Sequence, residues 1–442
     1  MDGVRGDTPI DAVIDDGQVQ TLFQPIVHLV AEATVGFEAL SRGPAGTELE
    51  SPIAMLDAAG VAGRLGELDW LCRTKAMQIA ERSGFHPSVS WFINVEPAGL
   101  ELECPAHLRP ALERARTELR VVLEMVERNV EGQVTNLLRA TDQARSDGWG
   151  VSLDDVGAES GSLALLPFFQ PDVIKLDMRL IGRTSPEQAA EISGAVRAYA
   201  EDHGAVILAE GIETHEQERQ ARVFGATYGQ GYRYGAPGTL PKSCPVPRDP
   251  IPLRQHLKPL AGASAFAVLH ATIPGQRGDL DSLSPITSHL ASHCTSANNA
   301  GVLLGLFDSE ADYRSRRDSY DALAETNAFT LCLIHEGHTR RSDPRYRVLP
   351  VARDSALARE TAIVVISPYY AGALVTQKTD DPRDLEHRLV DYIYTHNRSA
   401  VVAAGRALLD HMELESRPTT ALPITNYRDR VVWGRRWGRH VR

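Results

Sequence analysis

Residues Val35 to Arg42 read Val-Gly-Phe-Glu-Ala-Leu-Ser-Arg, and they decide how the rest of the sequence is interpreted. An apolar run leads into this stretch, and one acidic residue, Glu38, interrupts it. A carboxylate at that place either disturbs a core strand or is the first ligand of a bound group. Six later strand-like runs also end on a polar or charged residue, so the remainder of the chain decides between the two interpretations.

The first half of the chain alternates strand-like and helix-like segments. The strand-like runs are Leu22–Leu29, Val35–Leu40, Val89–Val95, Arg120–Val126, Gly150–Asp154, Val173–Leu176, Ala205–Ala209 and Gly229–Tyr234. Helical patterns lie between most of them, and this spacing predicts an α/β fold, a (β/α)8 TIM-like barrel, rather than an open sheet. The first connection is too short for a helix, which predicts an antiparallel first strand.

A proline-rich stretch then interrupts the chain, because its prolines exclude a helix or a central strand. We expect a barrel domain at 15–240, a linker at 241–262, a second mixed α/β domain at 263–415 and a basic tail at 416–442. In the second domain we expect strands at 301–307, 329–335 and 362–367, and helices at 285–300, 311–324, 384–396 and 399–413. The arginines and tryptophans of the tail indicate either a solvated segment or a contact for an anionic partner.

Composition and charge narrow the function. The formal net charge of −12 argues against general nucleic-acid binding, which needs a basic field. The N-terminal residues lack the apolar region of a signal peptide, and no apolar run is long enough to span a bilayer. Five scattered cysteines without paired spacing are typical of a reducing compartment. We therefore expect a cytoplasmic protein that does not bind membranes.

Polar residues close seven of the strand-like runs: Glu38, Asn94, Glu124, Asp154 with Asp155, Lys175, Glu210 and Gln230. In a (β/α)8 barrel the carboxyl ends of the strands meet at one rim, so these side chains are expected to converge there. Carboxylate and amide oxygens suit Mg²⁺ or Mn²⁺, and two such ions can clamp a displacement at phosphorus. Taken singly, each residue could instead be a cap, a turn residue or a solvated charge. The coincidence across seven strand ends favours a metal site.

The chain resembles the EAL-domain cyclic di-GMP phosphodiesterases over about residues 18–240. Eight ordered motifs carry the resemblance: LFQPIV (22–27), GFEALSR (36–42), FINVEP (92–97), VLEMVE (122–127), LDDVG (153–157), DVIKLD (172–177), AEGIET (209–214) and QGYRYG (230–235). The resemblance implies a metal-dependent hydrolase that opens cyclic di-GMP to linear pGpG with two Mg²⁺ or Mn²⁺ ions. A homodimer through the barrel domain is expected only by analogy.

The resemblance also implies a role for each matching residue. The first ion would be held by Glu38, Asn94, Glu124 and Asp154, and the second by Asp154, Asp155 and Glu210. Lys175 would orient the attacking water. Glu210 is also a candidate general base, although a carboxylate that ligates a cation is a poor base. Substrate contacts are expected from Gln24, Leu40, Arg42 and Gln230, and indirect support of the ligands from Glu127 and Glu213.

One departure from the family concerns the loop after Asp155. Active members usually continue with Phe and a Thr-Gly-Tyr sequence, whereas this chain has Val156 and then Ala158-Glu159-Ser160. This difference keeps an alternative function open, a catalytically weak or inactive receptor that binds cyclic di-GMP without cutting it. A purely structural barrel is a third hypothesis, and it predicts lost ligands, which the sequence does not show.

The second domain resembles the DICT sensory module in three stretches, Val302–Phe307, Tyr313–Tyr320 and Ala362–Tyr370. Such a module implies regulation of the barrel domain by a signal or ligand that the sequence does not reveal. The histidines of this domain have no metal-ligand spacing, so no metal site is expected there.

Overall fold

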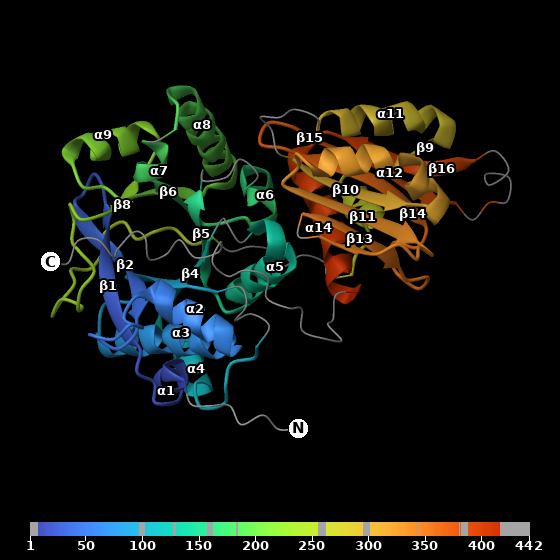
Figure 1. The fold of residues 1–442 in the computed structure, drawn as a ribbon. Helices are drawn as coiled ribbons and strands as arrows, with labels where there is room; N and C mark the ends of the chain where they lie inside the picture. The colour runs from blue at the N-terminus through green and yellow to red at the C-terminus, as the bar shows by residue number, and fades with distance from the viewer. Residues whose placement is uncertain are drawn as a thin grey trace, which may run out of the picture.

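The computed structural model describes residues 8–96, 102–126, 130–156, 162–182, 184–254, 262–294, 301–343, 345–379, 381 and 388–415. These residues form two sheets, a closed barrel of eight strands and an open sheet of eight strands. The barrel takes the blue-to-green first half of the chain, and the open sheet takes the yellow-to-red second half (Figure 1).

The first sheet closes into a barrel in the order of its strands along the chain, which confirms the predicted fold class. Its strands are β1 (Gln20–His28), β2 (Ala33–Arg42), β3 (Ser90–Asn94), β4 (Arg120–Val126), β5 (Gly150–Val156), β6 (Val173–Asp177), β7 (Val206–Glu210) and β8 (Tyr228–Gln230). β1 is antiparallel to both β2 and β8, as the short first connection predicts. The other neighbouring strands pair in parallel.

Helices surround this barrel: α1 (Pro9–Asp15), α2 (Pro52–Ala62), α3 (Leu65–Arg82), α4 (Arg109–Glu118), α5 (Val130–Ser146), α6 (Ser162–Phe169), α7 (Met178–Ile181), α8 (Pro186–His203) and α9 (His215–Val223). The sequence patterns did not predict α1, α4 and α7. The bounds of α8 show how local sequence determines where a helix begins and ends. Ser185 caps its first turn, Pro186 is its first residue, and Gly204 ends it at φ +66°.

An apolar layer fills the amino-terminal half of the barrel lumen. It consists of Ile26, Val35, Phe92, Val122, Val173, Leu208, Tyr228 and Ile251. Ile251 comes from the proline-rich segment, is fully buried, and accepts a hydrogen bond from the Arg120 guanidinium at 2.6 Å through its backbone oxygen. The proline-rich segment therefore closes one end of the barrel as well as leading to the second sheet.

The second sheet has the order β12-β13-β11-β10-β14-β15-β16-β9. Its strands are β9 (Gln276–Asp279), β10 (Val302–Phe307), β11 (Phe329–His335), β12 (Arg341–Ser342), β13 (Tyr346–Val351), β14 (Glu360–Ile366), β15 (Ala371–Lys378) and β16 (Leu389–Thr395). Its helices are α10 (Ala265–His270), α11 (Leu280–Ser292), α12 (Glu310–Ala324) and α14 (Arg398–Glu415). The three expected strands of this half correspond to β10, β11 and β14.

The helix predicted at 384–396 is wrong where the structure describes it, because residues 389–395 form β16. This strand buries Val390 and Ile393 and pairs with β15 on one side and β9 on the other. Pairing with strands distant in sequence outweighs the local helical pattern. The predicted tail, 416–442, lies outside the described residues.

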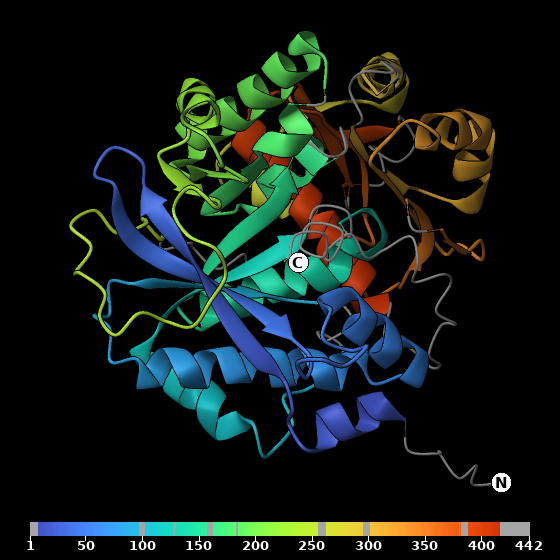
Figure 2. The same ribbon diagram turned by 60° about the vertical axis from the view of Figure 1, so that its left-hand side comes forward.

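Helix α14 lies between the second sheet and helices α5 and α6 of the barrel (Figures 1 and 2). Gly405 lets α14 come close to α6, since a Cβ at this position would lie 2.9 Å from the Phe168 ring. One continuous hydrophobic cluster contains residues of both sheets. In the described parts of the chain, no helix is both long and apolar enough to cross a membrane.

Candidate metal and substrate site

The polar residues at the strand ends stand directly above the apolar layer of the lumen. Asn94 follows Phe92 by two positions, and Glu124 follows Val122 by two positions. Side chains two apart in a strand share a face, so both polar residues point into the lumen. The same spacing relates Lys175 to Val173, Glu210 to Leu208 and Gln230 to Tyr228. The polar rim is therefore a continuation of the barrel interior.

Four carboxylates converge on one ammonium group in this rim. Lys175 has no exposed side-chain surface, and its Nζ lies 3.6 Å from Glu38 Oε2 and 3.4 Å from Asp154 Oδ1. The same Nζ makes short ion pairs with Glu124 and Glu210. We call Glu38, Glu124, Asp154 and Glu210 the carboxylate cluster. With every group ionised, the cluster and Lys175 carry a formal charge of −3 (−4 + 1), and all five side chains are buried.

The pKa values in this group reflect burial and mutual repulsion. Burial, followed by the negative charge of Glu38, raises the pKa of Glu124 well above its ordinary value, although the Lys175 ammonium opposes this. Burial alone would lower the pKa of Lys175, but the combined charge of the carboxylate cluster outweighs it and raises that pKa well above its ordinary value. The lysine is therefore charged, and the surrounding negative charge exceeds what one ammonium neutralises.

The donor set fits a hard divalent cation. Ligand oxygens of Glu38, Glu124 and Glu210 all lie within 4.8 Å of one another. Asn94 donates from its amide nitrogen to Glu38 Oε1 at 3.4 Å, and its buried amide oxygen has no hydrogen-bond partner among the described residues. Glu124 Oε1 faces the Lys175 ammonium, and its buried Oε2 has no hydrogen-bond partner there. Oxygens of this type are the ligands that Mg²⁺ and Mn²⁺ prefer.

Asp155 lies in β5 next to Asp154, but its side chain is outside the described part of the structure. Glu127 also lies outside the described residues. Glu213 forms its ion pair outside the carboxylate cluster. Its carboxylate is half-exposed and lies 2.5 Å from the guanidinium of Arg179. Support of the ligands by Glu127 and Glu213 stays a prediction.

Two glutamines connect the cluster to the first strand. The Gln230 amide donates to Glu38 Oε2 at 2.7 Å and to Gln24 Oε1 at 3.0 Å. Gln24 in turn donates to the backbone oxygen of Gly235 at 3.0 Å. Both glutamines are buried. The structure thus brings Gln24 and Gln230 to the rim, where they fix the orientation of the Glu38 carboxylate.

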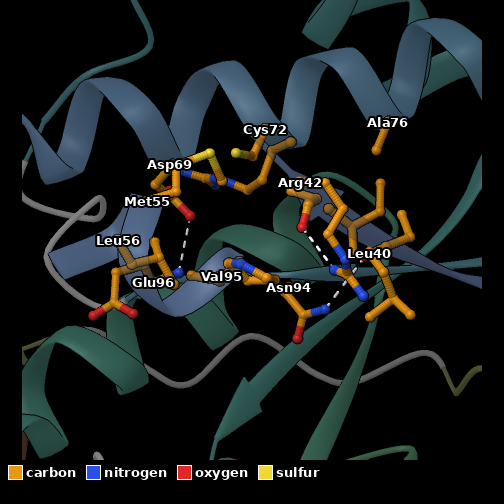
Figure 3. A pocket seen from close by; sticks show the side chains of 15 residues that line it. Leu40, Arg42, Met55, Leu56, Asp69, Cys72, Ala76, Asn94, Val95 and Glu96 are labelled. Atoms are coloured by element: carbon orange, nitrogen blue, oxygen red, sulfur yellow. Dashed lines mark hydrogen bonds and ion pairs between the residues drawn. The ribbon is translucent and has the colours of Figure 1, made fainter. Parts of the chain in front are cut away.

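A cavity of about 70 Å³ lies beside the rim, between the ends of β2 and β3 and helices α2 and α3 (Figure 3). Leu40, Arg42 and Asn94 line one side of it. Burial lowers the pKa of Arg42, against the opposing charge of Glu38, and its guanidinium donates to the Ser41 backbone oxygen at 2.7 Å. The cavity is smaller than the roughly 150 Å³ that holds a benzene, so a purine base would not be enclosed by it.

The sequence reasoning missed a buried ion pair on the far wall of this cavity. Asp69 and Arg73 of α3 are both 4% exposed, with Nη2 and Oδ2 2.5 Å apart. A signal was present, because these two charges stand at i and i+4 on a helix face that otherwise buries Leu65, Ala76 and Ala80.

The model of the EAL domain family matches residues 10–237. The chain therefore belongs to the EAL domain family, and the match covers the whole barrel.

Individual relatives are similar to the same part of the chain. YkuI from Bacillus subtilis (strain 168), an EAL-domain protein, is 27% identical over 236 residues, which cover 52% of this chain and 57% of YkuI. PdeB from Escherichia coli (strain K12), named a probable cyclic di-GMP phosphodiesterase, is 28% identical over 247 residues, which cover 52% of this chain and 44% of PdeB. The chain thus spans about half the length of these relatives.

Among solved structures, the barrel is similar to BlrP1 from Klebsiella pneumoniae, determined as a complex with manganese and cyclic di-GMP. The two are 28% identical, with a TM-score of 0.43, over 50% of this chain and 56% of BlrP1.

Proposed function

We propose that this chain hydrolyses cyclic di-GMP to linear pGpG with the help of two divalent cations, Mg²⁺ or Mn²⁺. One observation carries the proposal: four buried carboxylates converge on Lys175 at the carboxyl ends of the strands of an EAL barrel. The name of PdeB, a probable cyclic di-GMP phosphodiesterase, supports the choice of substrate.

Six side chains would hold the cations. The first would lie between Glu38, Asn94, Glu124 and Asp154, and the second between Asp154, Asp155 and Glu210. When bound, such cations lower the pKa of water and neutralise charge on a phosphodiester. Without them, the carboxylate cluster keeps an excess of negative charge that repels a phosphate.

The remaining residues of the rim act on the water and the substrate. Lys175 orients the attacking water with its ammonium group, and its positive charge stabilises the negative charge that develops on the phosphate oxygens. Arg42 binds a phosphate through paired hydrogen bonds, since its guanidinium is partly desolvated and close to the rim. Leu40 packs against the nucleotide. Gln24 and Gln230 hold Glu38 in place and contact the substrate edge.

We also propose that the chain works as a catalytic domain at 15–240 and a regulatory, DICT-like domain at 263–415. Helix α14 of the second part contacts α5 and α6, the helices on either side of β5, and β5 carries Asp154. The guanidinium of Arg406 pairs with Asp142 of α5, and the Tyr369 hydroxyl donates to the Glu191 backbone oxygen of α8 at 3.0 Å. A shift of α14 would thus act on the strand that holds two of the ligands. We further propose a cytoplasmic location and a homodimer through the barrel domain.

The deciding experiment measures pGpG formation from cyclic di-GMP by the full chain, with Mn²⁺, with Mg²⁺ and with EDTA. Glu38→Ala should lower kcat/KM by at least about 100-fold, because it removes a ligand. Glu216→Ala is the matched control, since this glutamate is 77% exposed on α9 and should leave the rate unchanged. Tight binding of cyclic di-GMP without any pGpG would instead select the receptor alternative.

A further inference from the structure

The segment that carries Asn94 is held from outside the barrel by α3. Asn94 is the last residue of β3, and the backbone N–H of Glu96, two residues later, donates to Asp69 Oδ1 at 2.9 Å (Figure 3). The backbone N–H of Val95 donates to the backbone oxygen of Glu124 at 3.0 Å. The chain just after Asn94 is therefore fixed on one side by β4 and on the other by a side chain of α3.

Asp69 can serve as this acceptor only because Arg73 neutralises it. Both side chains are 4% exposed, and an unpaired carboxylate at such a depth would be costly. The Arg73 guanidinium also lies over the ring of Trp70, with its carbon 3.7 Å from the ring centroid. Asp69, Trp70 and Arg73 thus form one connected group of side chains, which we call the α3 clamp.

The α3 clamp reaches a second point of the same connection. The indole N–H of Trp70 donates to the backbone oxygen of Leu102 at 2.8 Å. Glu96 and Leu102 are the described residues on either side of 97–101, and one turn of α3 holds both of them. A packing role alone would need no hydrogen bonds to the backbone at these two places, because apolar side chains fill a helix–strand interface as well.

We propose that Asp69 is a positioning residue for the metal site: with Arg73, it fixes the end of β3 so that the amide side chain of Asn94 lies against the carboxylate cluster. The proposal rests on the metal site of the proposed function. A weak ligand such as an amide oxygen depends strongly on its orientation, and loss of outer partners of metal ligands lowers affinity by about 10- to 100-fold.

Two double variants isolate the hydrogen bond from the buried charges. Asp69→Leu with Arg73→Met, the Leu/Met variant, removes both charges and the acceptor. Asp69→Asn with Arg73→Met, the Asn/Met variant, removes both charges but keeps an oxygen that can accept from the Glu96 N–H. Neither leaves an unpaired buried charge. Urea unfolding without metal, followed by circular dichroism, checks that both variants fold with similar midpoints.

Two measurements on the full chain then test the proposal. Hydrogen exchange of the metal-free protein, read on peptides that contain Val95 and Glu96, should be about tenfold faster in the Leu/Met variant than in the Asn/Met variant. Mn²⁺ titration, followed by the electron paramagnetic resonance of unbound Mn²⁺, should show about tenfold weaker binding in the Leu/Met variant and near wild-type binding in the Asn/Met variant. In an Asn94→Ala background the two variants should bind Mn²⁺ equally, because the ligand through which the clamp acts is gone.

Equal exchange rates in the two variants would overturn the clamp itself. Different exchange rates with equal Mn²⁺ affinities would overturn its role in positioning the ligand. A wild-type chain that takes up no Mn²⁺ would refute the proposed metal site and with it the positioning role, while the exchange data would still report the clamp. A chain that binds Mn²⁺ as expected but forms no pGpG would count against the proposed hydrolysis alone.

Discussion

Replacing Lys175 with methionine tests how the buried charges of the rim are balanced. At separations of 3.4 and 3.6 Å from Asp154 and Glu38, each pair contributes about 5 kcal/mol of gross attraction at an effective dielectric constant near 20. Much of this attraction is offset by desolvation. Removal of one partner from a buried ion pair nevertheless costs about 3–5 kcal/mol, because the carboxylates stay behind unpaired.

In the absence of metal we therefore expect Lys175→Met to lower the free energy of unfolding by about 3–5 kcal/mol. Mn²⁺ should reduce this deficit, since the variant presents the same carboxylates without a competing cation and should bind Mn²⁺ about tenfold more tightly. Each tenfold gain in affinity is worth about 1.4 kcal/mol of stability at saturating metal.

The assay is urea denaturation followed by circular dichroism, in EDTA and over a series of Mn²⁺ concentrations. Lys378→Met is the matched control: this lysine pairs with Asp308 on the surface, where both side chains are more than 40% exposed. Exposed pairs of this kind contribute about 0–1 kcal/mol, independent of Mn²⁺. A Lys175→Met protein as stable as the wild type in EDTA, or one that binds Mn²⁺ more weakly, would refute the reasoning.

Three further outcomes are expected. Ile251→Ala should lower the free energy of unfolding by about 2–5 kcal/mol in urea, because this fully buried side chain closes the apolar layer of the barrel. Gly231→Ala should cost at least about 2 kcal/mol and reduce the soluble yield, since its φ is +151° and a Cβ would lie 2.1 Å from the Ile212 oxygen. Arg406→Met should cost about 1 kcal/mol, a drop of about 1 °C in Tm for a chain of 442 residues. Asp142→Asn should cost a similar amount, and the double variant should cost no more than either single variant if the two side chains act as a pair.

The barrel could be predicted because its signals are local. Each strand is a short apolar run that ends on a polar residue. The connection between the first two strands is too short to contain a helix, so its length alone predicted that β1 is antiparallel to β2. The residue types at the rim were also evident from the sequence, since Asn94 and Glu210 stand at strand ends, where a barrel gathers its functional groups. Local patterns failed for β16, where pairing with two distant strands decides the conformation.

The sequence by itself determined which chemistry is available: several oxygen donors, one lysine and an arginine, spaced to meet at one rim. Only the tertiary structure decided that Lys175 stands among four carboxylates, that Asp69 and Arg73 hold the end of β3, and that α14 packs against the helices beside β5. The reason is physical. Periodicity along the chain reports which side a residue faces, whereas a pairing of buried charges or a helix contact depends on packing between segments far apart in sequence.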